Sequence, residues 1–191
     1  MKSLCGKMDY ICAYSDICSL MKFDINNVSI LPITIRENIY MVLVDLQSHK
    51  NTKKILKDLN NCYPFPKDNI STKVHEAFGV DSEKILDASL DAIIKGDNYL
   101  LGKLMTVSHK IFINKIIPAS KALASPKLIS VLSDPLVKSF IFGGKGIGSQ
   151  GDGSIQMTAK DIEAQKKLVE YINQKYNNYN AFPITLLKDK Q

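Results

Sequence analysis

Hydrophobic positions follow two kinds of pattern along this chain, and each kind predicts a different secondary structure. Short runs rich in β-branched and apolar residues are typical of strands. The expected strands cover 28–35, 39–45, 138–142, 154–159 ("SIQMTA") and 182–187 ("FPITLL"). Only the polar "REN" separates the first two runs, so we expect them to form a hairpin.

Between these runs, apolar residues recur every three to four positions, which predicts amphipathic helices. Capping residues and glycines set the expected ends of these helices. The expected helices cover 51–60, Ser82 to Gly96, Asp97 to Phe112, Pro118 to Leu132, and a final helix for which Thr158 is the N-cap. Two prolines make "CYPFPKDN" a loop after the first of them.

The order of elements from Tyr40 onward predicts a fold class. It runs strand, several helices, strand, glycine-rich loop, strand, helix, strand. This is a split β-α-β-β-α-β, or ferredoxin-like, α+β sandwich with extra helices in the first crossover, in which the glycine-rich loop joins two hairpin strands. Such a layout fixes no chemistry by itself, so the loops must supply it.

Composition describes an ordinary soluble globular chain. Its 191 residues are 45% hydrophobic and 23% charged, enough to bury a core in one domain or slightly more. The formal charge of +6 comes from scattered lysines, which is typical of solvated helix faces and compatible with an anionic substrate. No basic stripe is interleaved with aromatics, and the longest apolar runs are far shorter than a bilayer span, so we expect neither nucleic-acid binding nor membrane insertion.

Cysteine and histidine usage points away from a metal site. The four cysteines lack the paired spacing of zinc ligands, and without a signal peptide we expect a cytoplasmic protein. The three histidines, His49, His75 and His109, are isolated from one another, which favours a surface or core role for each over catalysis. We therefore assign no metal ligand.

The segment "GGKGIGSQGDGS", residues 143–154, holds six of the ten glycines. Glycine permits positive φ and a close approach by another group, and successive N–H groups in such a loop can form a concave nest for an anion such as phosphate. The alternative is a tight or flexible hairpin turn without catalytic meaning. Neither the P-loop pattern nor the dinucleotide-binding glycine spacing fits the segment.

"KGIGSQGDG", Lys145 to Gly153, resembles the third conserved motif of the GHMP kinases, the family of galactokinase, homoserine kinase, mevalonate kinase and phosphomevalonate kinase. In that family a glycine-rich loop lies against the nucleotide and the substrate. Gln150 and Asp152 depart from the family's pattern. The resemblance implies ATP and Mg2+ as cofactors, with ATP bound by Lys145, Gly146, Gly148, Ser149, Gly151 and Gly153.

"CGKMDYICAYS", Cys5 to Ser15, resembles the segment of the family's sugar kinases whose aspartate faces the acceptor hydroxyl. The resemblance implies that Asp9 orients that hydroxyl and takes its proton, and that Asp9, Tyr14 and Ser149 contact the substrate. Without the resemblance, Asp9 would be interpreted as a helix N-cap. The following "LMKFD" resembles the next strand of sugar-directed members and favours a sugar substrate.

The family's upstream Pro-x-x-x-Gly-Leu-Gly-Ser-Ser loop, which holds the ATP phosphates, has no counterpart in the 191 residues. We therefore expect residues 1–36 to be a remnant of the family's N-terminal domain and residues 37–191 to be its C-terminal domain. In one hypothesis the chain is the C-terminal part of a kinase that phosphorylates a sugar or related alcohol, or of a mevalonate-type kinase, and the N-terminal part is a separate chain, a lost exon or a truncated segment.

In the other hypothesis the same fold is a non-catalytic module that binds a ligand or a protein. A homo-oligomer contact would then cover the apolar face around Asp9.

Overall fold

The computed structural model describes residues 18–24 and 27–189. Along the chain these residues form β1 (Ser19–Phe23), β2 (Val28–Pro32), β3 (Ile39–Asp45), α2 (Thr52–Asn60), α3 (Asn69–Glu76), α4 (Ser82–Lys95), α5 (Asn98–Ile111), α6 (Pro126–Ser133), α7 (Pro135–Phe140), β4 (Ile141–Gly146), β5 (Ser154–Ala159), α8 (Ile162–Lys175) and β6 (Asn180–Leu186). No helix among them is long and apolar enough to cross a membrane.

Four of the strands form an antiparallel sheet in the order β4-β5-β3-β6. This order is the one that a split β-α-β-β-α-β chain produces, so the predicted fold class is confirmed. The glycine-rich segment joins β4 and β5 as a hairpin, as predicted. The extra helices, α2 to α7, all lie in the first crossover, between β3 and β4.

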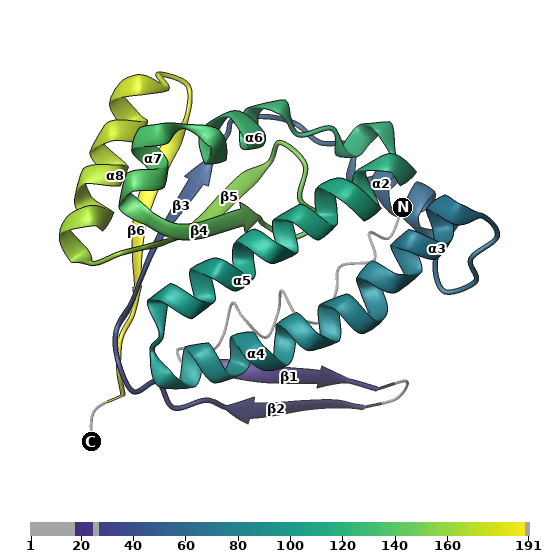
Figure 1. Cartoon of the computed structure of the whole chain (residues 1–191), viewed down its shortest axis with the longest axis horizontal. Coiled ribbons are helices and arrows are strands. Elements are labelled where there is room, and N and C mark those ends of the chain that lie inside the picture. The colour runs from purple at the N-terminus through teal and green to yellow at the C-terminus, as the bar shows by residue number, and fades with distance from the viewer. Residues whose placement is uncertain (1–17, 25–26, 190–191) are drawn as a thin grey trace.

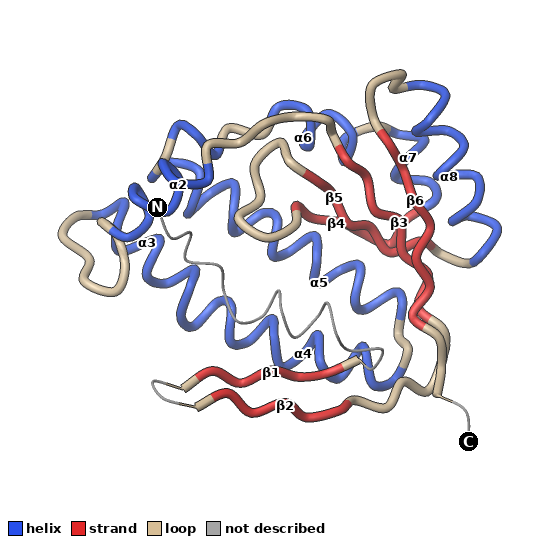
Figure 2. The backbone as a smooth tube through the Cα atoms, turned by 180° about the vertical axis from the view of Figure 1, so that it is seen from behind, coloured by secondary structure: helices blue, strands red, loops and turns tan. Residues whose placement is uncertain are grey.

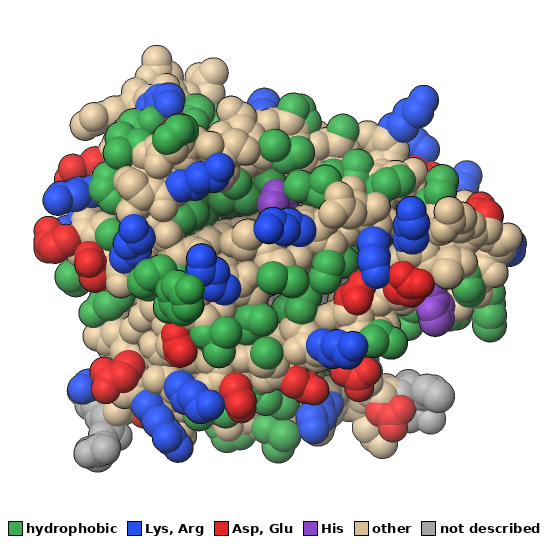
Figure 3. Space-filling model, in the orientation of Figure 1, with side chains coloured by type: hydrophobic (Ala, Val, Ile, Leu, Met, Phe, Trp, Pro, Cys, Tyr) green, Lys and Arg blue, Asp and Glu red, His purple; other side chains and the backbone are tan. Residues whose placement is uncertain are grey.

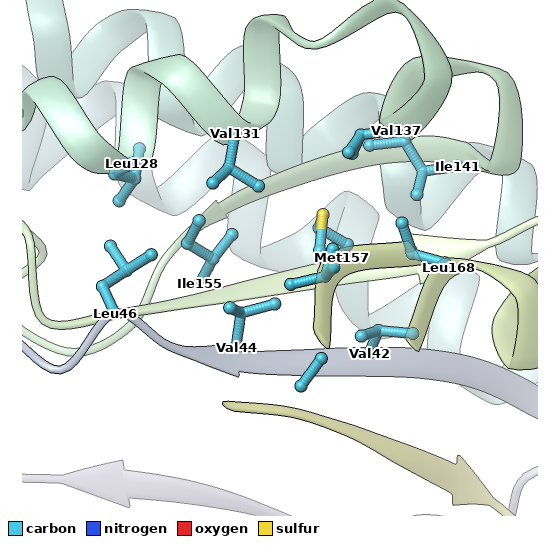
Figure 4. Close-up of a cluster of buried hydrophobic side chains, with 12 residues drawn as sticks. Val42, Val44, Leu46, Leu128, Val131, Val137, Ile141, Ile155, Met157 and Leu168 are labelled. Atoms are coloured by element: carbon cyan, nitrogen blue, oxygen red, sulfur yellow. The ribbon is translucent and has the colours of Figure 1, made fainter. Parts of the chain in front are cut away.

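Helices cover both faces of this sheet (Figures 1 and 2). On one face, α6, α7 and α8 enclose a core built on the alternating inward residues of β3 and β5. In Figure 4, Val42 and Val44 of β3 and Ile155 and Met157 of β5 point toward one another and toward α6 and α8. On the other face lies α5, with α4 beside it and the β1–β2 hairpin along α4 (Figure 1).

Local capping explains where several helices begin and end. Gly96 ends α4 in the left-handed conformation at φ 67°, and the Asp97 carboxylate accepts a hydrogen bond from the Leu100 amide at the start of α5, as predicted. The predicted N-cap Thr158 is wrong, because that residue lies in β5 and the Asp161 carboxylate caps α8 instead. Ser82 is likewise no N-cap, since Asp81 before it is already helical and the Ser82 hydroxyl donates back across the kink at Gly79 to the Ala77 carbonyl.

Three predicted elements are wrong, one in its strand partner and two in their boundaries. Residues 28–32 pair with β1 rather than with β3, whose neighbours are β5 and β6. Residues 138–140 end helix α7, because Asp134 caps that helix through the Leu136 amide. The helix expected from Pro118 to Leu132 is interrupted by an extended residue, Ser120, and α6 starts only at Pro126.

Candidate functional site

The first half of the glycine-rich segment lies in β4 and serves packing. A Cβ on Gly143 would collide with the Gly102 carbonyl oxygen of α5, and one on Gly144 would lie 2.7 Å from Met157 Cγ. A Cβ on Gly146 would lie 2.9 Å from Leu128 Cδ1 of α6. These glycines therefore let helices on both faces approach the edge of the sheet closely.

The second half is an open loop between β4 and β5. Gly148, Gln150 and Gly151 have positive φ values of 60°, 56° and 73°. Gly148 is exposed, and nothing lies within 4 Å of the position its Cβ would take. Space beside the backbone at Gly148 is thus open to a ligand.

Side chains from distant parts of the chain hold this loop in place. The Asp152 carboxylate accepts hydrogen bonds from the Lys127 and Leu128 amides at 3.2 and 2.9 Å, so it caps helix α6. Lys50 Nζ donates to the Gln150 carbonyl at 3.1 Å. Asp152, a departure from the resembled motif, is therefore the residue that anchors the loop to the positive end of a helix.

The contacts that anchor the loop are made by its carbonyl groups and by the Asp152 carboxylate, so most of its backbone N–H groups stay free. The Gln150 amide closes a turn onto the Ile147 carbonyl, and the Gly153 carbonyl accepts from Leu46. Within the described residues, the loop's other N–H groups donate to no protein group; they belong to Gly148, Ser149, Gly151, Asp152 and Gly153. Such a concentration of unpaired donors is what an anion-binding loop offers.

Lys145 stands at the base of the loop, in β4, opposite Gln156 of β5. Burial lowers the pKa of its ammonium group. The described part of the chain gives it no hydrogen bond and no ion pair. A half-buried cation without a partner favours an anionic ligand, because burying an unpaired charge is costly.

Lys145 also lines a cavity of about 800 Å3 between α4, α5 and the sheet. Most of the wall is apolar, with Leu101, Leu104 and Met105 from α5. Its polar residues are Ser82, Glu83, Ser89, Ser108, Lys145 and Gln156. A pocket of this size, mostly apolar with a few polar groups, is typical of small-molecule sites.

His109 of α5 and Gln150 of the loop are buried neighbours behind the loop. His109 Nδ1 and Gln150 Oε1 are both buried without a hydrogen-bond partner. Burial lowers the pKa of His109, the Gln150 side chain opposes this, and the Lys145 ammonium lowers the pKa further. The imidazole is therefore neutral at pH 7, so it does not repel the ammonium group of Lys145.

The predicted nucleotide residues come together around this loop, with Lys145 and Gly146 in β4 and the other four between the strands. Asp9 and Tyr14 lie outside the described residues, so their assignment stays a prediction. Sequence reasoning missed Lys50, His109 and the anchoring role of Asp152. Lys50 is separated from Gln150 by 100 positions, and no spacing in the sequence could have paired them.

The implied Mg2+ finds no ligand set in the described ranges, where no group of three His, Cys, Asp or Glu side chains could hold a metal ion. Glu83 is the acidic residue in the wall of the cavity. One carboxylate does not make a metal site, although Mg2+ in nucleotide sites takes several ligands from water and phosphate. We assign no magnesium ligand.

No protein-family model matches the sequence, and no curated protein matches it. Solved structures do. The L. major mevalonate kinase in complex with R-mevalonate matches with a TM-score of 0.68 and 17% identity, over 91% of this chain and 50% of that one. The Streptococcus pneumoniae phosphomevalonate kinase with phosphomevalonate and AMPPNP matches with a TM-score of 0.62 and 11% identity, over 83% and 43% of the two chains.

The Lactococcus lactis galactokinase with galactose matches with a TM-score of 0.57 and 12% identity, over 90% of this chain and 51% of that one. The chain thus spans about half the length of the structures it matches. Identities this low establish the fold alone. The predicted resemblance is confirmed at that level: this chain has the fold of the GHMP-family kinases, over about half of their length.

Proposed function

We propose that this chain is the C-terminal part of an ATP-dependent GHMP-type kinase and that its β4–β5 loop binds the phosphates of the nucleotide. One observation carries the proposal. The loop presents five amides, beside a half-buried lysine, and none of these groups has a partner among the residues that the structure describes. Backbone N–H groups and a lysine ammonium are the donors that phosphate oxygens accept from in nucleotide sites.

The loop suits this task because contacts within the chain hold its backbone. Asp152, Lys50 and the Ile147 carbonyl fix the backbone, so the free amides need little reorganisation when an anion binds. Gly148 leaves room for a phosphate oxygen to approach the backbone. AMPPNP, an ATP analogue, is bound in one of the similar structures, which supports ATP as the ligand.

Phosphoryl transfer needs little covalent chemistry from the protein, which mainly positions the groups and stabilises charge. Lys145 would neutralise charge on the transferred group from the floor of the site. Mg2+, when bound with ATP, would supply positive charge that offsets the charge of the phosphates. Asp9 remains the proposed base for the acceptor hydroxyl, on the resemblance of its segment alone.

The cavity beside Lys145 is the proposed acceptor pocket. The similar structures bind mevalonate, galactose and phosphomevalonate, all small molecules with hydroxyl groups. A sugar was favoured by the sequence. The apolar wall of Leu101, Leu104 and Met105 favours instead an alcohol with an apolar body and an anionic group facing Lys145, as in a mevalonate-type kinase.

The second candidate function is a non-catalytic module that binds a ligand or a protein on the same fold. A loop of free amides suits such a module equally well, because binding an anion needs no catalytic group. Both candidates share the anion-binding loop. A separate N-terminal chain or a second copy of this chain would complete the site in the first and cover the apolar face in the second.

Calorimetric titration with Mg-ATP tests the proposal. Lys145→Met keeps the buried aliphatic stem and removes the charge, and we expect it to weaken binding by about tenfold, from the loss of one charged hydrogen bond. Lys160→Met removes the same charge at an exposed position outside the loop and the cavity and is the matched control. Equal affinities in the two variants, or no heat with the wild-type chain, would contradict the proposed nucleotide site.

A further inference from the structure

A second cleft lies on the other side of helix α5 from the proposed acceptor pocket. Its volume is about 450 Å3, and it shares no lining residue with the larger cavity. The cleft is walled by α5 and the helical turn that follows it, by α6 and α7, and by strand β4.

The charges around this cleft all have one sign. Lys103, Lys110 and Lys138 are exposed and converge on it from α5 and α7. No aspartate or glutamate is among its described lining residues. Of the three lysines, Lys103 lies over the Tyr99 ring at 5.2 Å, and none forms an ion pair with a described residue.

The inner part of the cleft is mostly apolar, and its polar side chains are His109 and Thr106, whose hydroxyl donates to the Gly102 carbonyl. Ile113, Ile129, Leu132 and Phe142 form the walls. His109 is 7% exposed, and its Nδ1 has no hydrogen-bond partner. Figure 3 shows the same arrangement from outside, as a hollow in which a histidine is visible with lysine or arginine side chains around it.

Some lysines outside the cleft have acidic partners: Lys115 pairs with Glu76 and Asp81, and Lys175 pairs with the buried Asp134. The three cleft lysines instead face one concave space whose described lining holds no acidic residue. Clefts lined by one sign of charge and low-dielectric walls concentrate ions of the opposite sign.

We propose that this cleft binds a small organic phosphate, a phosphate monoester with an apolar body, at a site separate from the nucleotide loop. Such an ester carries close to two negative charges at pH 7, which three lysines at the rim offset. Its apolar body fits between Ile113, Ile129 and Leu132. The enclosed volume lies within the range of small-molecule sites and is too small for a polymer.

Phenyl phosphate is the test compound, titrated into the full chain and followed by calorimetry at low salt. We expect binding by the wild type, and a loss of about tenfold or more in Lys103→Gln/Lys138→Gln, because both lysines are exposed and their charges act on the same ligand. Lys160→Gln, which removes an exposed charge elsewhere, should bind like the wild type. Melting temperatures of all variants check that each one is folded.

Two comparisons make the proposal falsifiable. Gly148→Val obstructs the nucleotide loop and should leave the phenyl phosphate affinity unchanged; lost binding would place the ligand at the loop and overturn the second site. Inorganic phosphate should bind more weakly than phenyl phosphate, and equal affinity would overturn the role of the apolar walls. No binding by the wild type, or equal binding by the double lysine variant, would also overturn the proposal.

Discussion

The contrast between Gly143 and Gly148 leads to a prediction about stability. In Gly143→Ala, the new Cβ would collide with the Gly102 carbonyl oxygen and the Thr106 hydroxyl, both in α5. The contact is close from the other side too, because a Cβ on Gly102 would lie 2.6 Å from Phe142 Cβ. The two glycines interlock, so an added methyl must push the whole helix away from the strand.

The size of the effect follows from that geometry. Overpacking a well-packed contact costs about 1–3 kcal/mol, and a clash with rigid backbone belongs at the upper end. Alanine in a strand recovers roughly 0.5 kcal/mol of backbone entropy relative to glycine. We therefore expect Gly143→Ala to lower the free energy of unfolding by about 2–3 kcal/mol. Gly148→Ala meets no atom, and its cost is the left-handed φ alone, about 1 kcal/mol.

Urea unfolding followed by far-ultraviolet circular dichroism measures both variants against the wild type. The m-value should be unchanged, so the difference lies in the midpoint. If Gly143→Ala unfolded within 0.5 kcal/mol of the wild type, or lost less stability than Gly148→Ala, the division of the segment into a packing half and an open half would be refuted.

Two carboxylates give the remaining predictions. Asp134→Ala should cost about 2–3 kcal/mol at pH 7, measured by urea unfolding, because it removes a buried partner of Lys175 and Tyr176 and the cap of α7. Although burial raises the Asp134 pKa, the hydrogen bonds from Lys175, the Leu136 amide and the tyrosines hold it well below its usual value. This stabilisation is full above about pH 4 and lost as the pH falls through the lower native pKa, so the wild type should lose stability on acidification more steeply than Asp134→Ala. Asp152→Ala should lower the free energy of unfolding by about 1 kcal/mol, because helix α6 loses its cap. A variant as stable as the wild type in urea unfolding would contradict the anchoring role of Asp152.

The order of elements could be predicted from the sequence because each pattern is local. Gly96 and Asp97 mark a helix end and a helix start that need no distant partner. Strand partners are not local. "REN" separates two apolar runs equally well in a hairpin and in a passage from one sheet to another, and only the pairing of β3 with β5 and β6 decides between them.

The backbone of the loop was predictable to the same extent. Clustered glycines indicate positive φ values, and Gly148 and Gly151 have them. The sequence could not divide the segment, because what fills the space beside Gly143 is a helix some 40 positions earlier. Nor could it connect His109, an isolated histidine, with Gln150 of the loop.

Amide chemical shifts test the central claim most directly. The 15N-labelled chain would be titrated with Mg-AMPPNP and its backbone amides followed by nuclear magnetic resonance. We expect saturable shifts of the free loop amides, Gly148, Ser149, Gly151, Asp152 and Gly153, with little change in the Asp134 cap of α7. Unchanged chemical shifts of the loop amides while amides elsewhere shift, or a spectrum that does not change at all, would contradict the claim that this loop binds phosphate.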